Sequence, residues 1–146
     1  MTAPTFATAR AVLALQPAGD LVGVELVEFS QGYAELRVAV RPALLQQHGY
    51  VHSGILAFVA DTALAVAGGS VLGSSVETGG LTVDHIRPAR GQVIRAVARV
   101  VASRATRAVC HCDVLVSDAG TEHLTATAQG TVRLRSTDSP LETDLR

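Results

Sequence analysis

One stretch decides the fold: residues 46–69, which read QQHGYVHSGILAFVADTALAVAGG. Between Ser53 and Ala67 almost every residue is apolar, and on a single helix this predicts burial on nearly all sides. The stretch therefore predicts a core helix over about residues 53–68. Asp61 lies within it, and no other side chain from Pro42 to Val76 carries a formal charge at neutral pH. Burying a carboxylate costs free energy unless a partner or a reaction uses it, so Asp61 is the first candidate for chemistry.

The residues just before this helix predict a place for an oxygen that gains negative charge. His52 and Ser53 precede the apolar run, and serine is favoured at a helix start because its oxygen accepts from first-turn amides. Those amides have no partner inside the helix, so the N–H groups of Ser53 and Gly54 are candidate donors to an oxyanion. Asp61 lies roughly 10–12 Å further along the helix at the standard rise. A substrate or a partner subunit therefore has to bridge the two, and a dimer interface would do so.

The composition is that of one domain spanning residues 1–146. With 48% hydrophobic and 17% charged residues, a chain of 146 residues can bury its own core. A net charge of -1 argues against nucleic acid or a membrane surface as partner. No uncharged apolar run approaches the roughly 20 residues of a membrane span, because Asp61 interrupts the longest one. The first residues also lack the pattern of a secretory signal, so we expect a cytoplasmic protein.

Cys110 and Cys112 are two residues apart in a strand-like run, so both side chains point to one face of the strand. That spacing is poor geometry for a disulfide, and we expect free thiols in a reducing compartment. A metal site would need more ligands nearby, and His111 points to the opposite face. We predict neither a metal nor a cofactor.

The remaining pattern predicts a short helix over about residues 5–16, ended by Pro17 and Gly19, and then six strands. Two strands precede the central helix and four follow it; a bulge or a close approach of another backbone is expected at residues 79–80. In the last strand, alternation places Leu124 on the core face and Thr125 on the other. A polar tail follows at about residues 136–146. An antiparallel sheet wrapped around one apolar helix, an α+β fold, is the simplest way to bury that helix.

The run QQHGYVHSGILAFVADTALAVAG resembles the hotdog-fold acyl-CoA thioesterases of the PaaI-like type. The resemblance continues through TGGLTVDHIRPARG and the closing strands, from about residue 22 to residue 134. It implies a hotdog fold, an acyl-CoA substrate, and a homodimer, often paired into a tetramer, with active sites at the subunit interface.

By position, the resemblance implies catalytic roles for five residues. Asp61 matches the carboxylate that acts as nucleophile or as general base on water. Ser53 replaces a usual glycine whose amide polarises the thioester carbonyl. Gln46 falls where relatives carry an asparagine that helps hold the same carbonyl. His52 would orient the loop or touch the thioester, and Thr78 would position the attacking water.

Further residues are candidates for substrate binding. Gly54 would supply a second amide, and Tyr50 and Phe58 would form pocket walls. His48 is also a candidate for substrate binding, and the alternative is that its role is purely structural. Arginines at strand ends and turns could hold the phosphates of CoA: Arg87, Arg90, Arg104 and Arg107.

Two other functions compete with thioester hydrolysis. A hydratase or dehydratase of acyl thioesters would use His52 and Asp61 together to move protons at a substrate carbon. A non-catalytic acyl-CoA-binding module would gain nothing from an isolated carboxylate beside an anionic ligand. The sequence does not separate aromatic from medium-chain acyl groups, nor nucleophilic attack by Asp61 from base catalysis.

Overall fold

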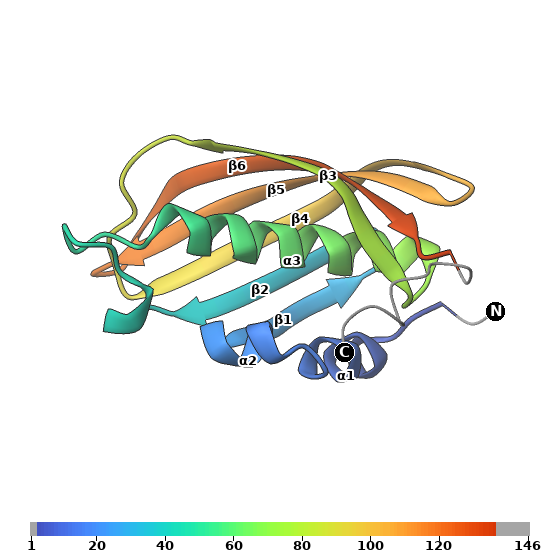
Figure 1. Ribbon diagram of the computed structural model, residues 1–146, viewed down its shortest axis with the longest axis horizontal. Coiled ribbons are helices and arrows are strands. Elements are labelled where there is room, and N and C mark those ends of the chain that lie inside the picture. The colour runs from blue at the N-terminus through green and yellow to red at the C-terminus, as the bar shows by residue number, and fades with distance from the viewer. Residues whose placement is uncertain (1–2, 137–146) are drawn as a thin grey trace, which may run out of the picture.

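The computed structural model describes residues 3–136 as a curved antiparallel sheet of six strands around one long helix (Figure 1). The strand order is β1-β2-β4-β5-β6-β3. This is the α+β hotdog arrangement that the sequence predicts; the predicted tail lies outside the described residues, apart from Ser136. The elements are α1 (Phe6–Ala14), α2 (Pro17–Val22), β1 (Val24–Ser30), β2 (Tyr33–Ala39), a 3-10 turn (Pro42–Leu44), α3 (Ser53–Leu72), β3 (Val76–His85), β4 (Val93–Arg104), β5 (Arg107–Asp118) and β6 (Thr121–Leu134).

The central helix α3 is longer than predicted, because it continues through Gly68 and Gly69 to Leu72. A Cβ on Gly68 would lie 2.7 Å from the side chain of Val132 in β6, so α3 meets the sheet where only glycine fits. Close packing on the sheet thus outweighs the low helix propensity of glycine. The sequence predicted no run long enough to span a membrane, but α3 is long and apolar enough to do so by length and composition alone. Of its most apolar stretch, 56% is buried inside the protein, as is typical of a core helix.

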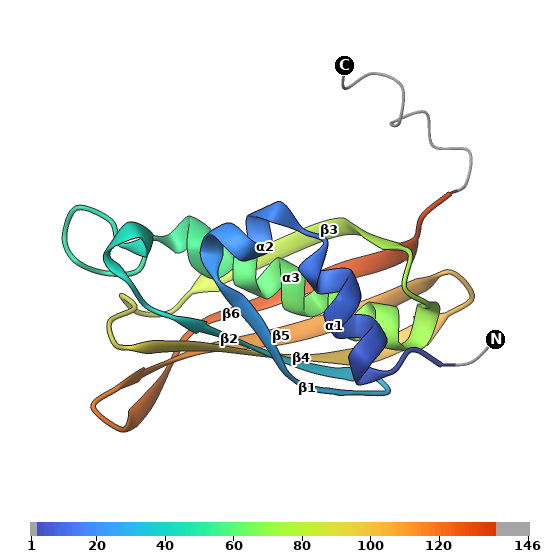
Figure 2. The same cartoon turned by 90° about the horizontal axis from the view of Figure 1, so that it is seen from below.

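The N-terminal segment forms two helices: α1 confirms the helix predicted over about residues 5–16, and α2 was not predicted. Pro17 starts α2 rather than ending α1, since proline has no N–H to lose at the first helical position. Gly23 ends α2 with a φ of 87°, which favours glycine. Figure 2 shows α1 on the side of the molecule where β1 runs, in front of α3 in this view.

The predicted bulge in β3 is confirmed, because the pairing of β3 with β6 shifts between Thr78 and Gly80. The predicted facing of β6 is wrong at one end. Val114 pairs with Ala126 and Leu115 with Leu124, so Thr125 is an extra residue that has no paired residue in β5. Its hydroxyl donates to the Val114 carbonyl at 3.0 Å and it is buried, whereas Leu124 is 37% exposed. A single bulge therefore inverts the alternation that the sequence suggests.

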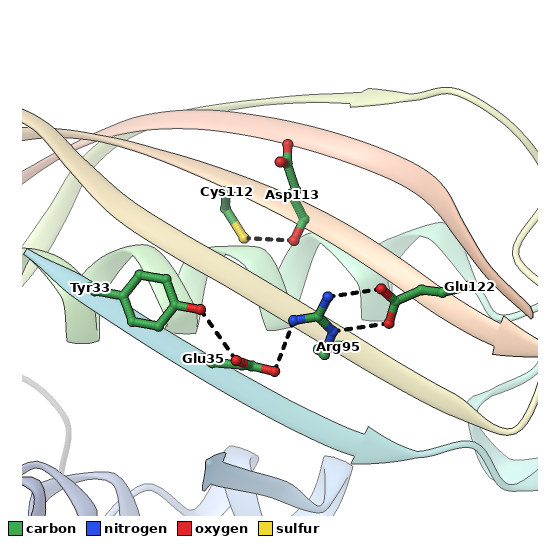
Figure 3. Close-up of polar contacts among 6 residues, drawn as sticks. All are labelled: Tyr33, Glu35, Arg95, Cys112, Asp113 and Glu122. Carbon is green, nitrogen blue, oxygen red and sulfur yellow. Dashed lines mark hydrogen bonds and ion pairs between the residues drawn. The ribbon is translucent and has the colours of Figure 1, made fainter. Parts of the chain in front are cut away.

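A polar cluster crosses the face of the sheet opposite α3 (Figure 3). Arg95 of β4 contacts Glu35 of β2 at 3.0 Å and Glu122 of β6 at 2.8 Å, and Tyr33 donates to Glu35 at 3.2 Å. Hydrogen bonding from Arg95 lowers the pKa of Glu122, and burial together with the charge of Glu35 raises the pKa of Tyr33. The cluster joins three strands of the sheet that are distant in sequence.

Both cysteines are free and completely buried in the sheet. Burial raises the pKa of Cys110 to about 11 and that of Cys112 to about 12. The Cys112 thiol lies 3.6 Å from the Asp113 carbonyl oxygen (Figure 3). Within residues 3–136, no group of three or more His, Cys, Asp or Glu side chains could hold a metal ion.

Candidate active site

His52, not Ser53, caps the start of α3. Its Nδ1 accepts the Gly54 N–H at 2.8 Å, whereas the sequence suggested that the Ser53 hydroxyl would cap the helix. A ring nitrogen that accepts an N–H carries no proton, so the neutral His52 ring has its proton on Nε2. The cap also explains Gly54, because a Cβ there would lie 3.0 Å from His52 Nδ1.

The cap leaves one first-turn amide for a ligand. Gly54 donates to the His52 ring, and Ile55 and Leu56 donate to the His52 carbonyl at 2.9 and 3.3 Å. For the Ser53 N–H, the described part of the chain contains no hydrogen-bond partner. Ser53 is exposed, so this N–H stands at the positive end of the helix dipole and can reach an oxygen outside the helix.

This helix start lines an open cleft of about 620 Å³, a volume typical of small-molecule sites. Its walls come from the loop before α3, the first turn of α3 and the segment after β3. Arg87 in the last segment contacts His123 Nδ1 at 2.9 Å. The cleft therefore gathers several predicted site residues: Gln46, Tyr50, His52, Ser53 and Arg87.

Gln46 holds the loop that forms one wall of the cleft. Its backbone N–H donates to the Tyr50 carbonyl at 2.8 Å, and its carbonyl accepts from Gly49 at 3.0 Å. Its side-chain Oε1 accepts from the backbone N–H of His48. Because the amide oxygen is engaged with the loop, the side-chain NH₂ is the group that Gln46 can offer to a carbonyl oxygen. His48 is exposed and contributes its backbone here, in keeping with the structural alternative.

Asp61 belongs to a different part of the surface, although it is on the same helix. The Thr78 hydroxyl donates to Asp61 Oδ1 at 2.6 Å, from the residue just before the β3 bulge. Ala57, Phe58, Asp61 and Ala65 lie along one side of α3 that the chain leaves partly exposed. Asp61 does not line the cleft at Ser53, so one chain holds the two halves of the predicted site apart.

The four arginines do not gather at one place. Arg87 lines the cleft, and Arg90 lines a neighbouring hollow with Gly49 and Val51. Arg104 and Arg107 flank the turn between β4 and β5, at the opposite end of the sheet from the start of α3 (Figure 1). Of the four arginines, only Arg87 lines the cleft at Ser53, and Arg90 lies in the hollow next to it.

The fold and this helix start define the class of protein: a hotdog-fold protein with a small-molecule cleft at the N-terminus of its central helix. Residues 48–135 match the family model described as the thioesterase superfamily, and the chain belongs to that family. It is a thioester hydrolase. No curated protein matches the chain.

Solved structures agree with this assignment. A thioesterase family protein from Silicibacter pomeroyi is 30% identical, with a TM-score of 0.83 over 86% of this chain and 93% of its own. A mutant of the phenylacetic acid degradation protein PaaI from Thermus thermophilus is 26% identical, with a TM-score of 0.71 over 82% of this chain and 100% of its own. The E. coli PaaI protein, from the phenylacetic acid degradation operon, shares the fold at 21% identity, with a TM-score of 0.77 over 88% and 91% of the two chains. The PaaI-like resemblance is thus confirmed.

Proposed function

We propose that the protein hydrolyses acyl-CoA thioesters at two equivalent sites, each formed between two copies of the chain. One observation carries this proposal: the unpartnered Ser53 N–H and the Asp61–Thr78 pair are complementary halves of a hydrolytic site, yet they lie about 12 Å apart along one helix. The first half stabilises an oxyanion, and the second activates a nucleophile. A second copy supplies what each chain lacks.

The exposed side of α3 favours such a pairing. Ala57 lies midway between Ser53 and Asp61, so a two-fold axis near Ala57 would bring Asp61 of each copy level with Ser53 of the other. The small side chain of Ala57 allows the two helices to approach closely at that axis. Within residues 3–136, β3 pairs only with β6, so its other edge is open for the second copy to cover. Pairing of two such dimers into a tetramer is a further part of the proposal.

The reaction follows from the two halves. The thioester oxygen accepts the Ser53 N–H, with the His52 Nε2–H and the Gln46 NH₂ as further donors. From the other copy, Asp61 attacks the carbonyl carbon itself or removes a proton from the attacking water, and Thr78 holds the carboxylate in place. The tetrahedral oxyanion then collapses and the C–S bond breaks. When water attacks, the sulfur takes the proton that Asp61 removed, and CoA leaves as a thiol with the free acid as the other product. When Asp61 itself attacks, CoA leaves as the thiolate, and water then hydrolyses the acyl–Asp61 anhydride, which releases the free acid and the proton that the thiolate takes up. A single well-placed donor to that oxyanion is worth ~10²–10³ in rate.

Arg87 lines the cleft and Arg90 lines the neighbouring hollow, and we assign both to the phosphates of CoA. Tyr50 forms part of the same wall. A hydratase is less well supported, because His52 Nδ1 is committed to the helix cap and cannot remove a proton from a substrate carbon.

The test is release of free CoA, measured with a thiol reagent, from a panel of acyl-CoA substrates. Asp61→Asn keeps an oxygen for Thr78 but removes the charge, and should abolish turnover while thermal stability and acyl-CoA binding persist. Asp20→Asn, a change of the same kind at an exposed residue of α2, is the matched control and should keep the wild-type rate. Full activity in Asp61→Asn would refute the assignment, and tight binding by the wild type without thiol release would favour a binding module.

A further inference from the structure

A second cavity, separate from the cleft at Ser53, lies between α1 and the C-terminal half of α3. Its volume is about 90 Å³, and no charged side chain lines it. Its walls combine two helices and the ends of two strands, among them Ala9, Val12, Phe29, Ala65, Gly69 and Val76. The cavity suits an uncharged apolar group.

Two rows of residues lead from Asp61 to this cavity. On α3, Ala65 and Gly69 follow Asp61 at intervals of four, so the three lie along one side of the helix. On β3, Val76 lies two residues before Thr78 and therefore shares its face. The Thr78 hydroxyl contacts the Asp61 carboxylate. Val76 lies close to Gly69, because a Cβ built on Gly69 would be 3.6 Å from Val76 Cγ2. The cavity thus begins about one helical turn beyond the carboxylate.

We propose that this cavity receives the far end of the acyl group, and that α1 sets the acyl length. The inference rests on the proposed acyl-CoA hydrolysis and adds its substrate class: a straight medium-length acyl chain. When the thioester carbonyl is at Asp61, the chain runs along Ala65 and ends beside Gly69 and Val12. Val12 and Gly69 are then specificity-determining residues.

The dimensions determine the class. Asp61 and Gly69 are eight residues apart, ~12 Å along the helix, and an extended chain advances ~1.2 Å per bond, so the path holds about eight to ten carbons. An apolar protein cavity known to bind benzene measures about 150 Å³. A cavity of about 90 Å³ is smaller than that, so it fits the last few carbons of a straight chain better than a phenyl ring.

α1 is suited to a limiting role because it is held loosely. Of its residues only Leu13 is buried, and Val12 on the cavity wall is 36% exposed. Trimming Val12 should therefore widen the cavity without loss of the fold, and alanine is also the better helix former. Adding a methyl at Gly69 should fill part of the cavity, since its nearest neighbour would be at ordinary contact distance.

The experiment compares kcat/KM for butanoyl-, decanoyl-, tetradecanoyl- and phenylacetyl-CoA. The wild type should prefer decanoyl-CoA. Gly69→Ala should lower the decanoyl-to-butanoyl ratio by about tenfold or more, the usual effect of one methylene in a tight pocket. Val12→Ala should raise the tetradecanoyl-to-decanoyl ratio. Leu15→Ala removes an apolar side chain that is 80% exposed on the same segment, outside the cavity, and should leave both ratios unchanged.

The outcomes separate this inference from the proposed function. If the wild type hydrolyses acyl-CoA but prefers phenylacetyl-CoA, or if neither variant changes the ratios, the cavity does not bind the acyl end and the inference is overturned while hydrolysis stands. If no acyl-CoA releases thiol, the proposed function fails and the inference fails with it.

Discussion

Replacing Ser53 by proline removes one N–H group from the helix start and changes little else. Ser53 is the first residue of α3, the position at which proline is best tolerated in a helix. The preceding residue, His52, has φ -59° and ψ 132°, an extended conformation compatible with a following proline. The Ser53 N–H has no partner within the described chain, so no internal hydrogen bond is lost.

The expected loss is therefore confined to catalysis. One oxyanion donor contributes ~10²–10³ to kcat, which is ~3–4 kcal/mol of transition-state stabilisation. The folded state should not weaken, since proline at a compatible position restricts the unfolded chain and adds ~0.4–1 kcal/mol of stability. Ser53→Pro should thus lower kcat at least a hundredfold while its thermal midpoint stays the same or rises slightly.

Steady-state thiol release and thermal unfolding, measured on the same preparation, check both halves of this prediction. Ser53→Ala is the matched control: it removes the hydroxyl but keeps the N–H, and should lose far less activity. A fully active Ser53→Pro would show that the amide does not hold the carbonyl.

Three further predictions concern the scaffold. Gly68→Ala should lower the thermal midpoint by several degrees, because the clash with Val132 costs ~1–3 kcal/mol and exceeds the gain in helix propensity; Gly69→Ala, with room for the methyl, should not. Cys110 and Cys112 should not react with a thiol reagent at pH 8 in the native protein, since both are buried with pKa values raised to about 11 and about 12; rapid labelling would contradict their burial. The lowered pKa of Glu122 means that its pairing with Arg95 stabilises the folded state above pH 4.5 and that this stabilisation fades as the pH falls below that value. Chemical denaturation should therefore show wild type and Glu122→Gln differing most near neutral pH and converging in acid, and a constant difference would refute that pairing.

The sequence predicted those features that depend on local pattern. The isolated Asp61 in an apolar run marked both the core helix and the candidate carboxylate, and the glycine pair after Thr78 marked the bulge. The six strands and their order along the chain followed from alternation and turn residues. The contact between Thr78 and Asp61 agrees with the roles that the resemblance implied, although those roles stay predictions.

What the sequence missed depends on geometry between distant residues or on position within a turn. Pro17 was interpreted as a helix breaker, but at the first position of α2 it starts a helix. The Ser53 hydroxyl was taken as the cap because it is the commoner capping group, and only the structure shows His52 Nδ1 on the Gly54 amide. Arg95 joins residues 60 and 27 positions away in the chain, and no local pattern indicates such a cluster.

The central claim is that each site takes Asp61 from one copy and the Ser53 amide from the other. It is tested most directly by isolating, with two different affinity tags, the dimer of one Asp61→Asn chain and one Ser53→Pro chain. A dimer of either variant alone should hydrolyse acyl-CoA only very slowly. The mixed dimer contains one site in which both the Asp61 carboxylate and the Ser53 N–H are intact, so it should recover about half of the wild-type activity. A mixed dimer as inactive as its parents would contradict a site shared between two copies.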